Sequence, residues 1–187
     1  MSAARDRWLD EGIEVLVEEG SAGVRIDRLA ARLGLSKGSF HHHFAGADGF
    51  KKDLLDHVED ILTSSLQQAI DAARGEPTAR RILMGLIEMV TASDDQVYRP
   101  RLEIALRAWA LADVDAARTQ ERVDAARLGA LRRVWRRGSD DDDDVRIGAM
   151  LPYVLALGAT VIMPPLSSAD LRKLYERILP LVPDDLA

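Results

Sequence analysis

The chain has 187 residues, no cysteine and a formal net charge of −6 at pH 7. This length allows one or two small domains with a sizeable core, and the lack of cysteine excludes disulfides and thiolate metal sites. No apolar run of the kind found in a secretory signal follows the first residue, so the default expectation is a cytoplasmic protein.

The spacing of apolar residues predicts nine helices and no strands, and therefore an all-α fold. Gly20 ends the first helix, and prolines at positions 77 and 100 open the fifth and sixth helices, a position that proline favours. The predicted ranges, in chain order, are 3–19, two short helices between 24 and 44, 47–74, 77–92, a helix that begins at 100, 113–137, the acidic run to about 163, and 168–179.

The two short helices form the most informative segment of the chain. Four apolar residues spaced three or four apart give the first of them a buried face: Ile26, Leu29, Ala30 and Leu33. Gly34 ends this helix because glycine adopts the left-handed backbone of a C-terminal turn, and Ser36 is a good N-cap for the next helix. In that second helix Phe40 and Phe44 are four residues apart and are expected to point inward.

The outward face of the second short helix is small, polar and cationic, which suits insertion into the major groove of DNA. The charge around it agrees, although the whole protein is acidic. Residues 25–52 contain six lysines and arginines and two aspartates, a net charge of +4. Local charge sets the attraction to phosphate. The residues expected to face outward are Lys37, Gly38, Ser39, His41 and His42.

This segment resembles the DNA-binding end of TetR-type (tetracycline-repressor-like) transcriptional regulators. In that family the second helix of the helix-turn-helix has a pattern close to G-[VL]-S-K-G-[ST]-[LF]-Y-x-H-F, which residues 34–44 match in order at every position but 41. Two positions depart from the family: His41 replaces the usual tyrosine, and Ala47 replaces a lysine common at the start of the next helix. Lys51 or Lys52, one turn further on, could replace the phosphate contact of that lysine.

The pattern and the resemblance together predict a DNA-contacting surface. Lys37, at the helix N-terminus, is expected to meet phosphate, while Gly38 and Ser39 set how closely the helix approaches the base edges. His41 could reach bases, and His43, where the family has a common histidine, is expected to meet a phosphate. The predicted DNA-binding residues are Arg28, Ser36, Lys37, Gly38, Ser39, His41, His42, His43, Lys51 and Lys52.

Two clusters invite a metal-site interpretation that their spacing does not support. The consecutive histidines at 41–43 point about 100° apart on a helix, whereas helical metal pairs need spacings of three or four residues. The acidic run at 140–144 lacks the glycine and the distal glutamate of a calcium loop. We expect Ser139 to cap a helix there, with the aspartates complementing its dipole. No metal and no cofactor are predicted.

Residues 147–169 contain no charged side chain. Pro152 and the Pro164–Pro165 pair argue against a membrane span, and a helix that is apolar all round is otherwise buried between other helices. TetR-type proteins dimerise through their last two helices, so the resemblance implies a homodimer interface here. Small residues would let a partner helix approach closely, and the predicted interface residues are Gly148, Ala149, Ala156, Gly158 and Ala159.

Large apolar and aromatic residues of the later helices are expected to belong mostly to an ordinary core. In TetR-like proteins the same helices enclose a small-molecule effector pocket, and such pockets are largely apolar with a few polar groups. Trp109 and Tyr153 each supply area and one hydrogen-bonding group, and Arg107 would suit an anionic effector. The predicted effector-binding residues are Met84, Tyr98, Arg107, Trp109, Met150 and Tyr153.

The prediction is therefore an N-terminal helix-turn-helix domain, residues 1–46, followed by a helical effector-binding and dimerisation domain, residues 47–187. The expected protein is a homodimeric transcriptional regulator, by family habit a repressor, that binds a palindromic operator and is released by a small molecule. A helical dimer without sequence-specific DNA binding is the alternative, motivated by His41 and Ala47. An enzyme using the histidines with Asp48 lacks a convincing nucleophile, metal set or phosphate loop, so no enzyme is predicted.

Overall fold

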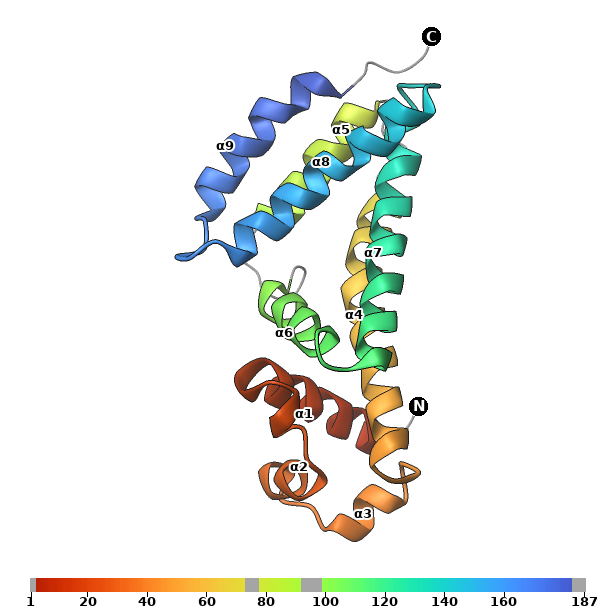
Figure 1. Ribbon diagram of the computed structural model, residues 1–187, viewed down its shortest axis with the longest axis vertical. Coiled ribbons are helices and arrows are strands. Elements are labelled where there is room, and N and C mark those ends of the chain that lie inside the picture. Colours follow the sequence, from red (N-terminus) through yellow and green to blue (C-terminus); the bar gives the residue numbers. More distant parts are fainter. Residues whose placement is uncertain (1–2, 73–77, 92–98, 183–187) are drawn as a thin grey trace. The chain divides into compact units, whose positions relative to one another are not determined.

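The computed structural model describes residues 3–72, 78–91 and 99–182, and these residues form helices and no strand (Figure 1). The predicted all-α class is thereby confirmed. Two short 3₁₀ turns, η1 (Ser21–Gly23) and η3 (Leu179–Leu181), accompany the α-helices. The α-helices are α1 (Ala3–Glu19), α2 (Ile26–Leu33), α3 (Lys37–His41), α4 (Gly46–Ala72), α5 (Ala79–Thr91), α6 (Pro100–Ala110), α7 (Val114–Trp135), α8 (Asp142–Val161) and α9 (Ser168–Ile178).

The chain divides into two compact units, which are described separately. The N-terminal unit comprises Met1–Ile61 and Arg101–Arg122, and the C-terminal unit comprises Leu62–Pro100 and Val123–Ala187. Helices α4 and α7 each contribute residues to both units. The compact N-terminal unit therefore contains most of α6 and the start of α7 together with the helix-turn-helix. The functional division after residue 46 concerns roles and stays a prediction.

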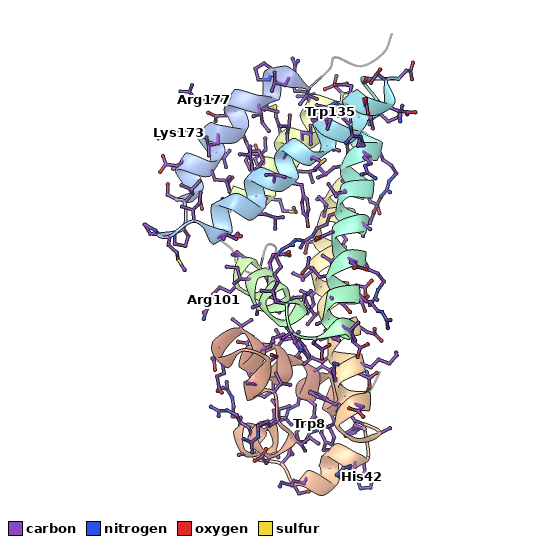
Figure 2. All side chains as sticks on the ribbon, viewed as in Figure 1. Trp8, His42, Arg101, Trp135, Lys173 and Arg177 are labelled. Carbon is purple, nitrogen blue, oxygen red and sulfur yellow. The ribbon has the colours of Figure 1, made fainter. Side chains whose placement is uncertain are left out.

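The core of the N-terminal unit is aromatic. Trp8 of α1 lies on Phe40 of α3, with ring centroids 5.3 Å apart, and Phe40 contacts Phe44 at 5.0 Å. Phe44 in turn lies edge-on to Phe50 of α4 at 4.9 Å. All four rings are buried, and Figure 2 shows Trp8 inside the group of helices that they join. Edge-on and tilted pairs of this kind add stability beyond the burial of area, so α1, α3 and α4 are held as one body.

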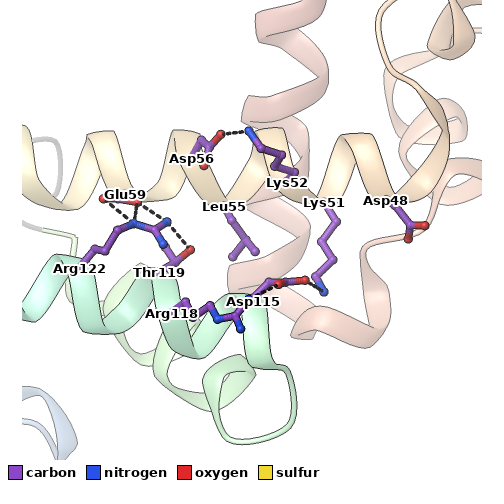
Figure 3. Close-up of a pocket in the computed structure, with 10 residues that line it drawn as sticks. All are labelled: Asp48, Lys51, Lys52, Leu55, Asp56, Glu59, Asp115, Arg118, Thr119 and Arg122. Carbon is purple, nitrogen blue, oxygen red and sulfur yellow. Dashed lines mark hydrogen bonds and ion pairs between the residues drawn. The ribbon is translucent and has the colours of Figure 1, made fainter.

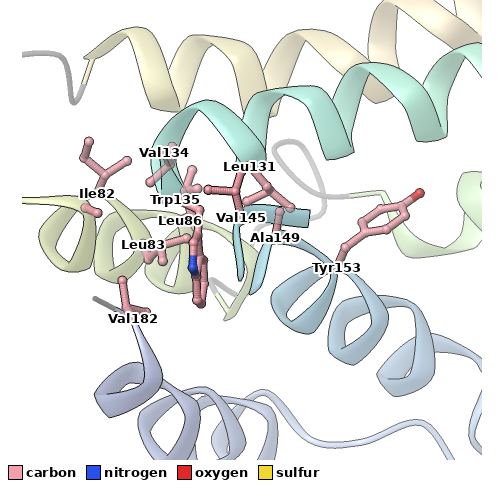
Figure 4. Packing of buried hydrophobic residues seen from close by; sticks show 11 residues of the cluster. Ile82, Leu83, Leu86, Leu131, Val134, Trp135, Val145, Ala149, Tyr153 and Val182 are labelled. Atoms are coloured by element: carbon pink, nitrogen blue, oxygen red, sulfur yellow. The ribbon is translucent and has the colours of Figure 1, made fainter. Parts of the chain in front are cut away.

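The C-terminal unit has its own core, built from α5, the end of α7 and the start of α8 (Figure 4). Trp135 lies at its centre, 2% exposed, and Gly148 of α8 packs directly on its indole ring. A second, smaller cluster joins Ile87 of α5 and Ala159 of α8 to Leu171 and Tyr175 of α9. Helix α8 is thus covered along one side by its own chain.

Among the described helices, α8 alone is long and apolar enough to cross a membrane by length and composition, with a mean hydropathy of 1.3. The core helices of soluble proteins share this length and composition. The packing of α8 on Trp135 and on α9 is of that kind.

Helix boundaries agree with the predictions to within a few residues, with two informative differences. Helix α3 ends at His41, and residues 42 and 43 form a turn, although the Phe44 amide still donates to the Phe40 carbonyl at 3.0 Å. Asp141, not Ser139, caps α8: its carboxylate accepts the Asp144 amide at 2.8 Å. The Ser139 hydroxyl instead accepts the amide of Asp141. The prediction placed the cap two residues too early.

Candidate nucleic-acid interface

The turn between α2 and α3 has the geometry that its residues predict. Gly34 adopts the left-handed conformation, with φ of 65°, and its amide bonds back to the last carbonyls of α2. The Ser36 hydroxyl then accepts the Ser39 amide at 3.2 Å and caps α3. Both features satisfy backbone groups that a helix end leaves without partners. They favour one angle between the two helices through local bonds alone.

Helix α3 has a buried face and an open one. Phe40 is fully buried and holds the helix onto the unit, while the side chains of Lys37, His41 and His42 are exposed, and His42 lies at the outer end of α3 in Figure 2. Ser39 and His43 are half-buried. An added Cβ at Gly38 would meet only the Ser36 hydroxyl, at 3.6 Å, an ordinary contact. Glycine at position 38 therefore leaves this part of the outer face of α3 without a side chain, and the packing of the unit does not require it.

Basic residues of the 25–52 segment that lie outside α3 form ion pairs with carboxylates. Arg28 bonds Glu19 at 2.5 Å, and Lys52 bonds Asp56 at 2.9 Å on its own helix. Arg32 pairs with Glu11 and Glu18 of α1. Hydrogen bonding to Glu18 raises the pKa of Arg32, and the same hydrogen bond lowers the pKa of Glu18.

The net charge of +4 over residues 25–52 therefore overstates the positive field. Glutamates at 11, 18 and 19 lie outside that window yet sit against its arginines. Helical periodicity could not predict these ion pairs, because the hydrogen-bonded partners are 9 and 14 residues apart in the sequence. Lys37 is the strongest candidate for a phosphate contact, since it is exposed and carries no ion pair among the described residues.

Lys51 is the most heavily engaged of the predicted DNA-contacting residues. Its Nζ donates to Asp113 at 2.6 Å and to Asp115 at 2.9 Å, both near the start of α7. Figure 3 shows the bond to Asp115. The hydrogen bond to Asp113, followed by that to Asp115, raises the pKa of Lys51, and the hydrogen bond to Lys51 lowers the pKa of Asp113. Residues 62 and 64 positions away supply these carboxylates, and helical periodicity cannot reveal pairs at such separations.

An open cleft of about 680 Å³ in the N-terminal unit joins several predicted residues of different roles. Lys37, His41 and Lys51 line it together with Trp109 of α6. Trp109 is 9% exposed, and its unit also holds Arg107, whose Nε donates to the buried Glu103 at 2.7 Å. Two predicted effector-binding residues thus belong to the unit that carries the helix-turn-helix.

The remaining effector candidates belong to the C-terminal unit or lie outside the described residues. Tyr153 is buried, and its hydroxyl donates to Asp124 at 2.5 Å. Met84 and Met150 are partly exposed, at 46% and 38%. Tyr98 lies outside the described residues. The role of all six in effector binding stays a prediction.

Three of the five predicted interface residues are buried inside the chain itself. Gly148 and Ala149 face the Trp135 core, and Ala159 faces α9. Packing within the chain accounts for their small size, and their part in a dimer interface stays a prediction. Ala156 and Gly158 are partly exposed. The exposed apolar side chains of α8 are different ones: Ile147, Met150, Val154 and Val161.

Among the described residues, no group of three or more histidine, aspartate or glutamate side chains is placed to hold a metal ion. His41 is the last residue of α3, and His42 and His43 follow it in a turn.

Comparison with known proteins agrees with this geometry. Residues 9–57 match the family described as bacterial regulatory proteins, tetR family. No curated protein sequence matches the chain. Among solved structures, E. coli NemR in its reduced form has 18% identity over the full length of both chains, with a TM-score of 0.77.

Two further solved structures are similar over nearly their whole length. A TetR transcriptional regulator from Legionella pneumophila has 12% identity and a TM-score of 0.76, covering 97% of this chain and 98% of its own. A protein from Saccharomonospora viridis, described as a transcriptional regulator and solved in complex with choline, has 17% identity and a TM-score of 0.72 over both full chains. Residues 9–57 therefore match the tetR family of bacterial regulatory proteins, and the chain as a whole has the fold of these solved structures.

Proposed function

We propose that the protein is a homodimeric, sequence-specific DNA-binding regulator, by family habit a repressor, acting in the cytoplasm. The observation that carries the proposal is α3 itself. Phe40 holds one face in the core, and the opposite face offers Lys37, Gly38 and His41 to a partner. A short helix of this kind inserts into the major groove, and two of them in a dimer match a palindromic operator whose half-sites lie about 34–36 Å apart.

The dimer is supported by the outer side of α8. Ile147, Met150, Val154 and Val161 recur at intervals of three, four and seven residues, and they are 49%, 38%, 56% and 63% exposed. Such a stripe marks a partner-binding face. A two-fold axis would place the stripe against its own copy. Ala156 and Gly158, the partly exposed members of the predicted interface, lie on the same helix.

For effector release we favour the C-terminal unit, where the Tyr153 hydroxyl bonds the Asp124 carboxylate beside the Trp135 core. The choline-bound relative from Saccharomonospora viridis supports a small-molecule ligand in a protein of this fold. Such a ligand acts by preferring one conformation, and a few kcal/mol of differential affinity is enough. A ligand-binding dimer without sequence-specific DNA binding is the alternative function, and the following experiment decides between the two.

The test is selection of DNA from a random pool by the wild-type protein, followed by binding measurements on Lys37→Ala and Gly38→Ala. Lys37→Ala should weaken binding to all sequences and reduce the slope of log affinity against log salt by about 0.9 for each phosphate that the protein no longer neutralises. Gly38→Ala should change which sequence is preferred, because a methyl group there alters the approach to base edges. If the wild type selects no sequence, or if the two variants behave alike on every DNA, the proposed function is wrong.

A further inference from the structure

The Lys51 side chain lies between a pair of carboxylates and an open cleft of the N-terminal unit. On one side its Nζ bonds Asp113 at 2.6 Å and Asp115 at 2.9 Å. Asp113 is itself anchored, because its other oxygen accepts the amides of residues 115 and 116, both at 3.0 Å. Asp113 therefore stands at the start of α7 as a fixed acceptor for the ammonium group, and Asp115, whose side chain is 54% exposed, is a second acceptor beside it.

On the other side Lys51 lines the open cleft that also contains Lys37 and His41, the residues proposed to face DNA. It lines a second cleft, of about 520 Å³, with Asp115 and Arg118 (Figure 3). One flexible lysine stem thus borders both spaces, and its side chain is 29% exposed. Ala47, one turn earlier on α4, carries no charge, so Lys51 is the first cation of α4 after the helix-turn-helix.

We propose that Asp113 and Asp115 are an internal competitor for DNA phosphate at Lys51. The inference rests on the proposed DNA-binding function. In the free protein the two carboxylates hold the ammonium group. On DNA the lysine leaves these carboxylates and pairs with a phosphate. Neutralising a DNA phosphate releases counterions, which favours this exchange. Ion pairs between partly exposed groups are weak in water, so the exchange is possible.

The competitor sits where the end of α6 turns into α7, since residues 111–113 connect these helices. The conformation of this turn would then set how readily Lys51 is released to DNA. It is a regulatory contact built into the DNA-binding unit, separate from any effector-binding residue of the C-terminal unit.

The experiment measures the affinity of variants for the DNA that the wild-type protein selects. The double substitution Asp113→Asn/Asp115→Asn is made both in the wild-type protein and in Lys51→Ala. Asparagine keeps an Oδ1 acceptor for the amides that Asp113 caps and removes the charge. Binding at low salt should tighten by about two- to tenfold in the wild-type background, the range expected when exposed ion pairs are removed. The gain should vanish in the Lys51→Ala background, because no lysine is left to release.

A matched control removes the same charge elsewhere. Asp142→Asn/Asp143→Asn acts in the C-terminal unit, where these residues pair with Arg136 and Arg146. It should leave affinity within the error of the wild type. Circular dichroism melting confirms folding, and Asp115→Asn alone serves if the double variant unfolds, since Asp113 is the acceptor that caps the start of α7.

Three results would overturn the proposal: no gain in affinity, a loss of affinity, or an equal gain in the Lys51→Ala background or the control. The last would show a general charge effect. Failure of the proposed function is distinguishable, because then the wild type selects no sequence and Lys37→Ala has no effect on binding.

Discussion

At the scale of single residues, Gly148 lies where the Trp135 ring leaves no room for a side chain. A Cβ added there would lie 2.1 Å from Cε2 and 2.4 Å from Nε1 of Trp135, distances that require the ring or the helix to move. Gly148→Ala should therefore lower the free energy of unfolding by about 1–3 kcal/mol, the usual range for overpacking a core. Urea denaturation measures this.

The matched control for Gly148 is Gly85, an exposed residue within α5 whose added Cβ would meet no atom within 4 Å. Gly85→Ala should stabilise the protein by up to about 1 kcal/mol, because alanine is the better helix former. If both substitutions shift stability in the same direction and by similar amounts, close packing on Trp135 is not the reason for glycine at 148.

Asp113 gives a pH-dependent prediction with a definite sign. The hydrogen bond from Lys51 lowers the pKa of Asp113 below 3.8. A carboxylate with a depressed folded-state pKa stabilises the fold above its unfolded pKa, and that contribution is lost as the pH falls through the folded pKa. The difference in Tm between the wild type and Lys51→Ala should thus narrow as the pH falls from about 6 to about 3.

The same pair can be followed without unfolding. In Lys51→Ala, carboxyl resonances in an NMR titration should show the pKa of Asp113 rising toward its ordinary value, because the hydrogen bond that lowers it most is gone. An unchanged Asp113 titration in Lys51→Ala would contradict the bond on which the Lys51 proposal depends.

At the scale of elements, the start of α8 has two candidate N-cap residues, and the structure uses the second. Both Ser139 and Asp141 are residue types that cap helices, and only Asp141 accepts the Asp144 amide. Asp141→Ala should lower the free energy of unfolding by about 1 kcal/mol, the typical cost of removing an N-cap. Ser139→Ala should have a smaller effect on urea denaturation, and the reverse order would place the cap at Ser139 instead.

Helix α3 is an element that its own residues do not stabilise. It has five residues, far fewer than an isolated helix needs. Its start is set locally by Ser36, but its position depends on Phe40 among Trp8, Phe44 and Phe50. The position of the proposed DNA-facing surface therefore depends on the aromatic core beneath it.

At the scale of the whole molecule, dimerisation can be tested on two faces of one helix. Val154 is 56% exposed on the outer side of α8, and Ala159 is 6% exposed and packed within the chain. Val154→Arg should give a folded monomer that loses operator affinity, because a charge would be buried twice across the two-fold axis. Ala159→Arg should instead destabilise the protomer.

Analytical ultracentrifugation reports the oligomeric state of these variants, and circular dichroism reports their folding. A folded Val154→Arg protein that remains as dimeric as the wild type would contradict the assignment of the outer α8 stripe to the interface.

The helices and most of the signals that end them could be predicted from the order of residues. Periodic apolar residues and Gly20 gave the bounds of α1, and Gly34 and Ser36 form the turn between α2 and α3 for reasons confined to a few neighbouring atoms. The tetR-family resemblance of residues 34–44 also came from this local pattern, and the family comparison confirmed it.

Which side of a helix meets which partner depended on the packing of the folded chain. An apolar helix such as α8 presents no polar face to orient it, so the order of its residues could not predict that Gly148 packs against Trp135 of the same chain. Charge and the family pattern predict that Lys51 and Arg28 meet DNA, but they cannot reveal carboxylate partners on distant or separate helices. Periodicity describes neighbours within a helix, whereas ion pairs between helices depend on how the chain packs.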